Sequence, residues 1–164
     1  MGLPTISHVS DCVGNPNAQS DPPVGFKPYD SAPWDTTSQN SFRNVLEGWD
    51  GPGQIHNLVH VWVVGIADDG QLGTMNLMTS PNDPVFWLHH CYVDLLWADW
   101  TFRWAVVMPS GPITKYMPSG TPQEVGPLGH NLNDAMEPWG GATTPASVID
   151  HLSLGYYYYD PATI

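Results

Sequence analysis

The segment from Pro84 to about Trp104 carries the strongest helix pattern in the sequence. Asp83 can cap its amino end, and Pro84 fits the first helical position, where its missing N–H costs nothing. Aromatic and apolar side chains recur along one stripe of the segment together with a histidine: Phe86, His90, Val93 and Trp97. Such a helix is stable only when its stripe packs against another element. The predicted fold is therefore organised around this helix.

Shorter helices and long loops make up the rest of the prediction. Apolar residues at helical spacing predict helices over 41–49 and about 54–63, and a short helix is expected over 146–152. Residues 1–39, interrupted by six prolines, are expected to be a proline-rich N-terminal loop segment, and 40–164 the main region of one domain. Sustained alternation of polar and apolar residues is absent, so the expected fold class is all-α with extensive loops.

The composition excludes several classes of partner. The chain has 164 residues, enough for one domain with its own core. Its formal net charge is −12 with only four Lys or Arg, so neither nucleic acid nor an anionic membrane is an expected partner. No apolar run approaches the ~20 residues of a membrane span, and residues 1–5 do not resemble a signal peptide. The compartment stays unknown.

The chain is also poor in charge and rich in aromatic side chains. Charged residues make up 12% of it, against about a quarter in typical soluble domains, and it has eight Trp and seven Tyr. Either a partner chain or tight loop packing covers part of the surface, or the core is simply rich in aromatics. Cys12 and Cys91 could pair, but Cys91 lies in the long helix and is expected to be a small buried residue.

Histidines suggest a metal site. His56 and His60 lie four residues apart, on one face of the helix predicted over 54–63, so both imidazoles can reach one ion. His90 can join them from the long helix, and three neutral nitrogens without a thiolate suit copper, with zinc as the lesser possibility. His89 points about 100° away from His90, so it is expected to support the site or to be a hydrogen-bonded core residue. The pair His56 and His60 can also arise by chance.

Four motifs resemble the second copper-binding half of bacterial tyrosinases. They are YDSAPW over 29–34, SFRNVLEGW over 41–49, IHNLVHVW over 55–62 and SPNDPVFWLHHCYVDLLW over 80–97. A looser likeness continues through LNDAMEPW over 132–139 and the dipeptide Asp150-His151. The resemblance covers about residue 28 to the last residue, and its copper motifs are highly specific.

The resemblance implies a dicopper site. Members of this family hold two coppers in a four-helix bundle, three histidines on each, and bind dioxygen between the metals as a side-on peroxide. The ligands of the second copper correspond here to His56, His60 and His90. Copper is then the cofactor, with two ions per complete site and one held by this chain, and dioxygen is the co-substrate.

The same resemblance assigns roles to further residues. Glu47 and Asn57 match a pair that orients a water for deprotonating the incoming phenol, which makes them the expected catalytic residues. Phe86 matches an aromatic residue that packs against the site, and Val61 a position that tunes substrate preference. The remaining positions flank the substrate mouth or support the ligands: Met78, Thr79, Ser80 and His89.

One departure from the family concerns the first copper. Its three histidines precede the second half in the family, whereas this sequence offers only His8, His130 and His151, none in an i,i+4 pair. We therefore expect the half-bundle to be completed by another chain, either one that carries the first copper site or a second copy across a two-fold axis. Without it, an apolar face would be exposed beyond what monomers usually tolerate: Ile55, Val59, Phe86, Val93 and Trp97.

The function implied is that of an oxidoreductase subunit of tyrosinase or catechol-oxidase type. A dicopper-bound peroxide would hydroxylate monophenols at the ortho position and oxidise o-diphenols to o-quinones. This tyrosinase-like polyphenol oxidase would be active only as a dimer or with the chain that supplies the first copper site. The alternative is a non-catalytic module that binds copper or dioxygen, or a structural partner.

Overall fold

The computed structural model describes residues 3–14, 41–48, 55–65, 68–107, 133–136 and 142–159. These residues form helices and turns without a strand, which confirms the predicted all-α class. No helix among them combines the length and the hydropathy that crossing a bilayer requires. In chain order the elements are α1 (Ile6–Val13), α2 (Phe42–Glu47), α3 (His56–Val63), the 3-10 turns η1 (Thr74–Asn76) and η2 (Ser80–Asn82), α4 (Pro84–Val107) and α5 (Pro145–Val148).

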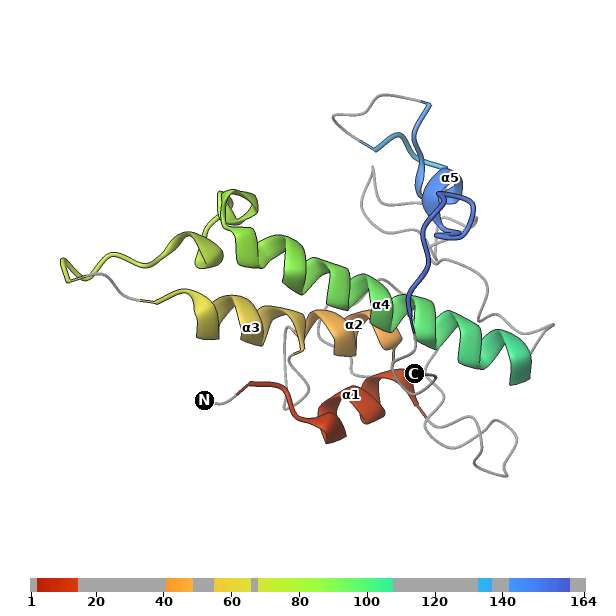
Figure 1. Cartoon of the computed structure of the whole chain (residues 1–164), viewed down its shortest axis with the longest axis horizontal. Helices are drawn as coiled ribbons and strands as arrows, with labels where there is room; N and C mark the ends of the chain where they lie inside the picture. The colour runs from red at the N-terminus through yellow and green to blue at the C-terminus, as the bar shows by residue number, and fades with distance from the viewer. Residues whose placement is uncertain are drawn as a thin grey trace.

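The long helix α4 is the element against which the others lie. Figure 1 shows α3 running along its amino-terminal half, with α2 beside its middle and α1 beyond α2. Contacts join α3 to α4, α2 to α3, and α1 to both α2 and α4. The segment that holds α5 lies on the opposite side of α4 (Figure 1). The predicted site helices, α3 and α4, are therefore direct neighbours.

Side-chain caps fix where α4 and α2 begin. Asp83 accepts a hydrogen bond from the backbone N–H of Val85 through Oδ1 at 2.9 Å, so the predicted start of α4 at Pro84 is confirmed. Ser41 caps α2 in the same way. Gly48 ends α2 in the left-handed conformation, with φ of 72°, which a residue without Cβ adopts readily.

The helix bounds differ from the predicted ones by a few residues. The helix predicted over 41–49 spans Phe42–Glu47, and the one predicted over 54–63 spans His56–Val63. The long helix continues three residues beyond Trp104, to Val107. The last one covers Pro145–Val148 and gives way to turns, because Asp150 accepts from the backbone of Leu152 and Ser153 instead.

The expected loop over 1–39 is wrong at its beginning, where Ile6–Val13 form α1. The helix starts with a reciprocal cap: the His8 N–H donates to Thr5 Oγ1 at 3.3 Å, and the Thr5 N–H donates to Nδ1 of His8 at 3.2 Å. Histidine stands where a glutamate usually completes this cap, so the sequence pattern gave no start signal. Residues 15–40 lie outside the described part, and the division of the chain at residue 40 stays a prediction.

The core lies where α1, α2 and α4 meet. The rings of Phe42 and Trp100 stack with their centres 4.7 Å apart and their planes 17° apart. Both side chains are 1% exposed. Around this pair lie buried residues from α1, α2 and α4 and from the start of α3: Cys12, Val13, Val45, Leu46, Ile55 and Leu96. The core thus holds α4 in place along its middle, just beyond the histidines.

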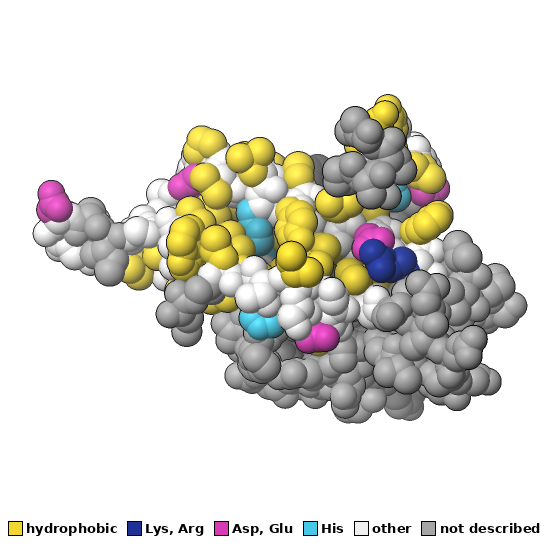
Figure 2. All heavy atoms as spheres, turned by 60° about the horizontal axis from the view of Figure 1, so that its bottom comes forward, with side chains coloured by type: hydrophobic (Ala, Val, Ile, Leu, Met, Phe, Trp, Pro, Cys, Tyr) yellow, Lys and Arg dark blue, Asp and Glu magenta, His cyan; other side chains and the backbone are white. Residues whose placement is uncertain are grey.

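The expected apolar face is partly covered within the chain itself. Ile55 is buried, and Val93 and Trp97 pack against a core that includes Cys12 and Val13 of the unexpected helix α1. The exposed large apolar residues lie instead on other stripes of α3 and α4: Val61, Trp62, Val85, Trp87, Leu88 and Tyr92. Figure 2 shows hydrophobic side chains gathered on both sides of a histidine on this face.

The two cysteines differ in exposure. Cys12 is fully buried in the core, whereas Cys91 is exposed. The expectation that Cys91 is a buried residue is therefore wrong. It lies one residue beyond His90 on α4, and adjacent helical residues point about 100° apart, so it faces outward where His90 faces α3.

A narrow loop returns the chain from α3 to α4. The N–H of Gly73 donates to the carbonyl of Gly65 at 3.3 Å, which closes the loop over the end of α3. A Cβ on residue 73 would lie 1.9 Å from the carbonyl oxygen of Val64, so only glycine fits there. The turn η1 follows directly and buries Met75, whose exposed fraction is 1%.

Candidate metal centre

Three imidazoles from two helices meet where α3 packs on α4. Nε2 of His90 lies 3.4 Å from Nε2 of His56 and 3.2 Å from Nε2 of His60. His56 and His60 are one turn apart on α3, so both face the neighbouring helix. The structure thus brings together the three histidines that the sequence predicts as ligands, and that ligand set itself stays a prediction.

The outer nitrogens of His56 and His60 contact oxygen atoms. Nδ1 of His60 lies 2.6 Å from the carbonyl oxygen of Met75, so this nitrogen must carry the proton and donate it. Nδ1 of His56 lies 3.1 Å from Oε2 of Glu47, a charge contact that is not aligned as a hydrogen bond. Both contacts favour the tautomer protonated at Nδ1, which leaves the two Nε2 lone pairs facing His90.

A fourth imidazole, that of His89, lies against the same group. Its ring is parallel to that of His56 with the centres 5.3 Å apart, and ring nitrogens of His56, His60 and His89 lie within 4.8 Å of one another. Nε2 of His89 is 3.0 Å from the backbone oxygen of His56, however, so this nitrogen donates to the start of α3. A second trio is therefore present, but one of its members is engaged by the backbone.

The environment keeps two of these imidazoles neutral. Burial, followed by the charges of the neighbouring histidines, lowers the pKa of His89 to about 4. Burial and the same neighbours lower the pKa of His90 to about 4 as well. A neutral imidazole is the form that binds a metal ion, so both side chains are in the binding-competent state near neutral pH.

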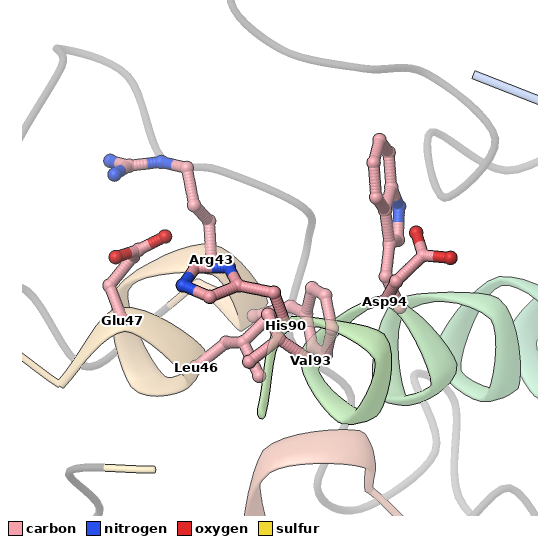
Figure 3. Close-up of a pocket in the computed structure, with 8 residues that line it drawn as sticks. Arg43, Leu46, Glu47, His90, Val93 and Asp94 are labelled. Carbon is pink, nitrogen blue, oxygen red and sulfur yellow. The ribbon is translucent and has the colours of Figure 1, made fainter. Parts of the chain in front are cut away.

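Glu47 stands at the edge of a cavity of about 280 Å³ between α2 and α4. Figure 3 shows Glu47 and Arg43 on α2, across from His90 and Asp94 on successive turns of α4. Burial acts to raise the pKa of Glu47, but the contact with His56 and the electrostatic attraction of His56 and Arg43 outweigh it and lower the pKa. The carboxylate is therefore ionised beside the histidine group.

The other predicted site residues differ in how close they lie to the imidazoles. The ring of Phe86 stacks on His90 with the centres 4.0 Å apart and meets His60 edge-on at 5.9 Å. Asn57 follows His56 on α3 and is partly exposed. Val61 is exposed on α3, next to His60. Met78 and Thr79 lie between η1 and η2 and are exposed, whereas Ser80 is the first residue of η2 and is buried.

Two of the remaining histidines have local roles. His8 caps α1, and the ring of His151 lies 5.6 and 5.9 Å from the rings of Tyr156 and Tyr158. His130 lies outside the described residues. Among the described side chains, the only group that could hold a metal lies at the α3–α4 contact.

Sequence reasoning missed three contributors to the site. The Met75 carbonyl that holds His60 is a backbone atom, and no side-chain pattern announces it. Arg43 lies one turn before Glu47 on α2, a spacing that could have suggested it. Asp94 lies one turn after His90 and lines the same cavity.

The donor set suits copper or zinc. It consists of neutral imidazole nitrogens without a thiolate. The Nε2 atoms of His56 and His60 face Nε2 of His90 across 3.4 and 3.2 Å. Lone pairs on nitrogens at these distances repel one another unless a proton or cation lies between them. Nitrogens bound to one ion at about 2.0–2.1 Å would have this mutual spacing. The described residues thus fit a single bound cation.

Comparison with known proteins identifies close relatives. A family model described as the common central domain of tyrosinase matches residues 10–103. The chain is 46% identical to a tyrosinase of Streptomyces glaucescens over 138 residues, 84% of this chain and 41% of that protein. It is 47% identical to the tyrosinase of Streptomyces antibioticus over 82% of this chain and 41% of that protein. The grixazone synthase of Streptomyces griseus is 38% identical over 80% and 40%. The chain spans about two fifths of the length of these relatives.

Proposed function

We infer that this chain supplies one copper-binding half of a polyphenol oxidase, because the chain belongs to the tyrosinase family. The observation that carries this inference is the convergence of Nε2 atoms from His56, His60 and His90 at the contact of α3 and α4. Relatives named tyrosinase that match more than four fifths of the chain support the same class of activity.

His56, His60 and His90 are the proposed ligands of one copper ion. His90 is preferred to His89 because Nε2 of His89 already donates to the backbone of His56. Glu47 and the Met75 carbonyl would hold the rings of His56 and His60 in the tautomer that presents Nε2. Bound copper, one ion in this chain and two in a complete site, would supply the redox chemistry with dioxygen as co-substrate.

The proposed reaction is ortho-hydroxylation of a monophenol and oxidation of an o-diphenol to an o-quinone. Glu47 and Asn57 are the proposed catalytic residues. The ionised carboxylate of Glu47 lines a cavity that also reaches His90, so a phenol or a water there would meet a proton acceptor beside a ligand of the metal. Asn57, next to His56, would orient that water through its amide.

Further residues would shape the access of the phenol. Val61 follows the ligand His60 and is exposed, so its side chain can touch a substrate that approaches the ion from that side. Thr79 and Ser80 lie on the loop that ends at α4, and Phe86 fixes the plane of His90. His89 would support α3 through the backbone of His56. These side chains are proposed to tune substrate preference and ligand orientation.

The complete centre would need three more imidazoles from outside residues 1–164. Two sources are proposed: a second chain that carries the first copper site, or a second copy of this chain across a two-fold axis. The exposed apolar residues of α3 and α4, among them Trp62, Leu88 and Tyr92, would pack at that contact.

Copper binding is the first test of the ligand set. The chain should bind one Cu²⁺, measured by equilibrium dialysis together with the assembly mass. His90→Ala should abolish this binding, whereas His89→Ala, the matched change at the neighbouring position, should retain it. Loss in His89→Ala and retention in His90→Ala would overturn the assignment and favour the trio with His89.

Oxygen uptake tests the reaction. The copper-loaded assembly should consume dioxygen when an o-diphenol is added, and the His90→Ala assembly should not. A copper-loaded wild-type assembly that takes up no oxygen with any phenol would contradict the oxidase proposal. It would favour the second candidate, a non-catalytic copper-binding module.

A further inference from the structure

A cluster outside the histidine group joins the end of the described chain to α4. The hydroxyl of Tyr156 donates to Oδ2 of Asp94 at 2.9 Å, and the hydroxyl of Tyr158 donates to the same oxygen. We call Asp94, Tyr156 and Tyr158 the tyrosine clamp. Its two tyrosines lie 62 and 64 residues from Asp94 in sequence, so the clamp is a long-range contact.

The four tyrosines over 156–159 form two pairs, Tyr156 with Tyr158 and Tyr157 with Tyr159. Residues two apart in an extended segment point to the same side. Tyr156 and Tyr158 therefore both reach Asp94, whereas Tyr157 and Tyr159 point away and are 71% and 66% exposed. The ring of His151 lies against both clamp tyrosines and supports them.

The hydroxyl protons of the clamp are held firmly. Partial burial, the hydrogen bond to Asp94 and its negative charge raise the pKa of Tyr156 to about 12. The same causes raise the pKa of Tyr158 further. Both hydroxyls therefore remain donors throughout the neutral pH range.

The clamp acts on the helical stripe that carries His90. Asp94 lies one turn after His90, and both line the 280 Å³ cavity with Glu47. One turn before His90, Phe86 stacks on its ring. On the outward stripes of this part of α4, Leu88, Cys91 and Tyr92 are exposed and give the helix little support from within the chain. The clamp is thus a lateral restraint on α4 next to the proposed ligand.

We propose that the three clamp residues are positioning residues for His90. They tie the 150–159 segment across α4. In this way they hold His90 at the distance from His56 and His60 that metal binding requires. This rests on the proposed copper site. Neither Tyr156 nor Tyr158 lines the cavity beside His90, so the effect of their hydroxyls is on ligand geometry. Partners that orient metal ligands typically change metal affinity by about 10–100-fold.

The test compares two matched double variants of the full chain. Tyr156→Phe with Tyr158→Phe removes only the clamp hydroxyls, and Tyr157→Phe with Tyr159→Phe removes the same groups from the exposed pair. The clamp variant should bind Cu²⁺ on the order of tenfold more weakly and show an altered Cu²⁺ electron paramagnetic resonance spectrum. The control variant should match the wild type in both, and circular dichroism should report the same helix content for all three.

Three results would overturn the proposal. Equal affinity and equal spectra in a folded clamp variant would show that the hydroxyls do not position His90. If the double variant does not fold, the single variant Tyr156→Phe replaces it. This variant retains the Tyr158 hydrogen bond and should show a smaller loss of Cu²⁺ affinity. Wild-type affinity in the folded single variant would reject the clamp. A wild-type chain that binds no Cu²⁺ would reject the copper site as well, so the two failures are distinguishable.

Discussion

Phe86 lies one helical turn before His90 on α4, and its ring stacks on the imidazole with centres 4.0 Å apart and planes 29° apart. The contact limits rotation of the His90 ring about its own side-chain bonds. Because Nε2 of His90 faces the α3 histidines only in one ring orientation, the apolar neighbour contributes to a polar site.

Phe86→Leu should weaken Cu²⁺ binding without unfolding the chain. An aromatic pair is worth about 0.5–1.5 kcal/mol beyond the area it buries, which corresponds to an affinity loss of about two- to tenfold. Dialysis of the variant against Cu²⁺ measures this. Phe102→Leu is the control, because Phe102 lies on the same helix, receives the same change and is 71% exposed. Equal affinities in the two variants would show that the stack does not orient His90.

Glu47→Gln and Asn57→Ala should impair monophenol turnover more than diphenol turnover. Only the monophenol must lose its hydroxyl proton before the ring is oxygenated, and general-base catalysis contributes about 10²–10⁴-fold. A fall of about 10²-fold in kcat for the monophenol is therefore expected, with a smaller effect on the diphenol, when variants and wild type are compared at equal copper content. Equal losses on both substrates would reject the role in proton removal.

Trp100→Ala should be among the most destabilising substitutions in the chain. The side chain is 1% exposed and stacked on Phe42, and deletion of a buried Trp side chain costs about 3–5 kcal/mol. Urea unfolding followed by circular dichroism gives the change in the free energy of unfolding. Phe102→Ala, two residues on and 71% exposed, should change it by less than about 0.5 kcal/mol. Similar losses in both variants would contradict the assigned core.

A thiol reagent should distinguish the two cysteines. Cys91 is exposed and should react fully in the folded chain, whereas Cys12 is fully buried and should react only after denaturation. Mass spectrometry of the labelled peptides measures this. Labelling of Cys12 in the native chain would mean that α1 leaves the core readily. Failure to label either cysteine even after denaturation would indicate a disulfide.

Local patterns were enough to predict the site helices and the histidine group. The cap at Asp83 and the start at Pro84 involve adjacent residues, and the i,i+4 spacing of His56 and His60 fixes their shared face whatever the rest of the chain does. The stripe position of His90 could be read for the same reason. These features depend on helix geometry alone.

Long-range contacts could not be predicted in this way. The Met75 carbonyl reaches His60 only because the loop closes over α3, and Tyr158 reaches Asp94 across 64 residues of chain. Helix α1 was not predictable because its cap uses His8. Without α1, the burial of Cys12 and the packing of Val93 against the core could not be predicted either. Each of these depends on which elements become neighbours after folding.

Gly73, in the loop before α4, affects how variants of this chain should be interpreted. The Val64 oxygen occupies the space where a methyl group would stand on residue 73, and the next turn carries the Met75 carbonyl that holds His60. A single added carbon would push that carbonyl away and release the imidazole. An assay would register this as a defect of the metal ligand, although the altered residue never meets it.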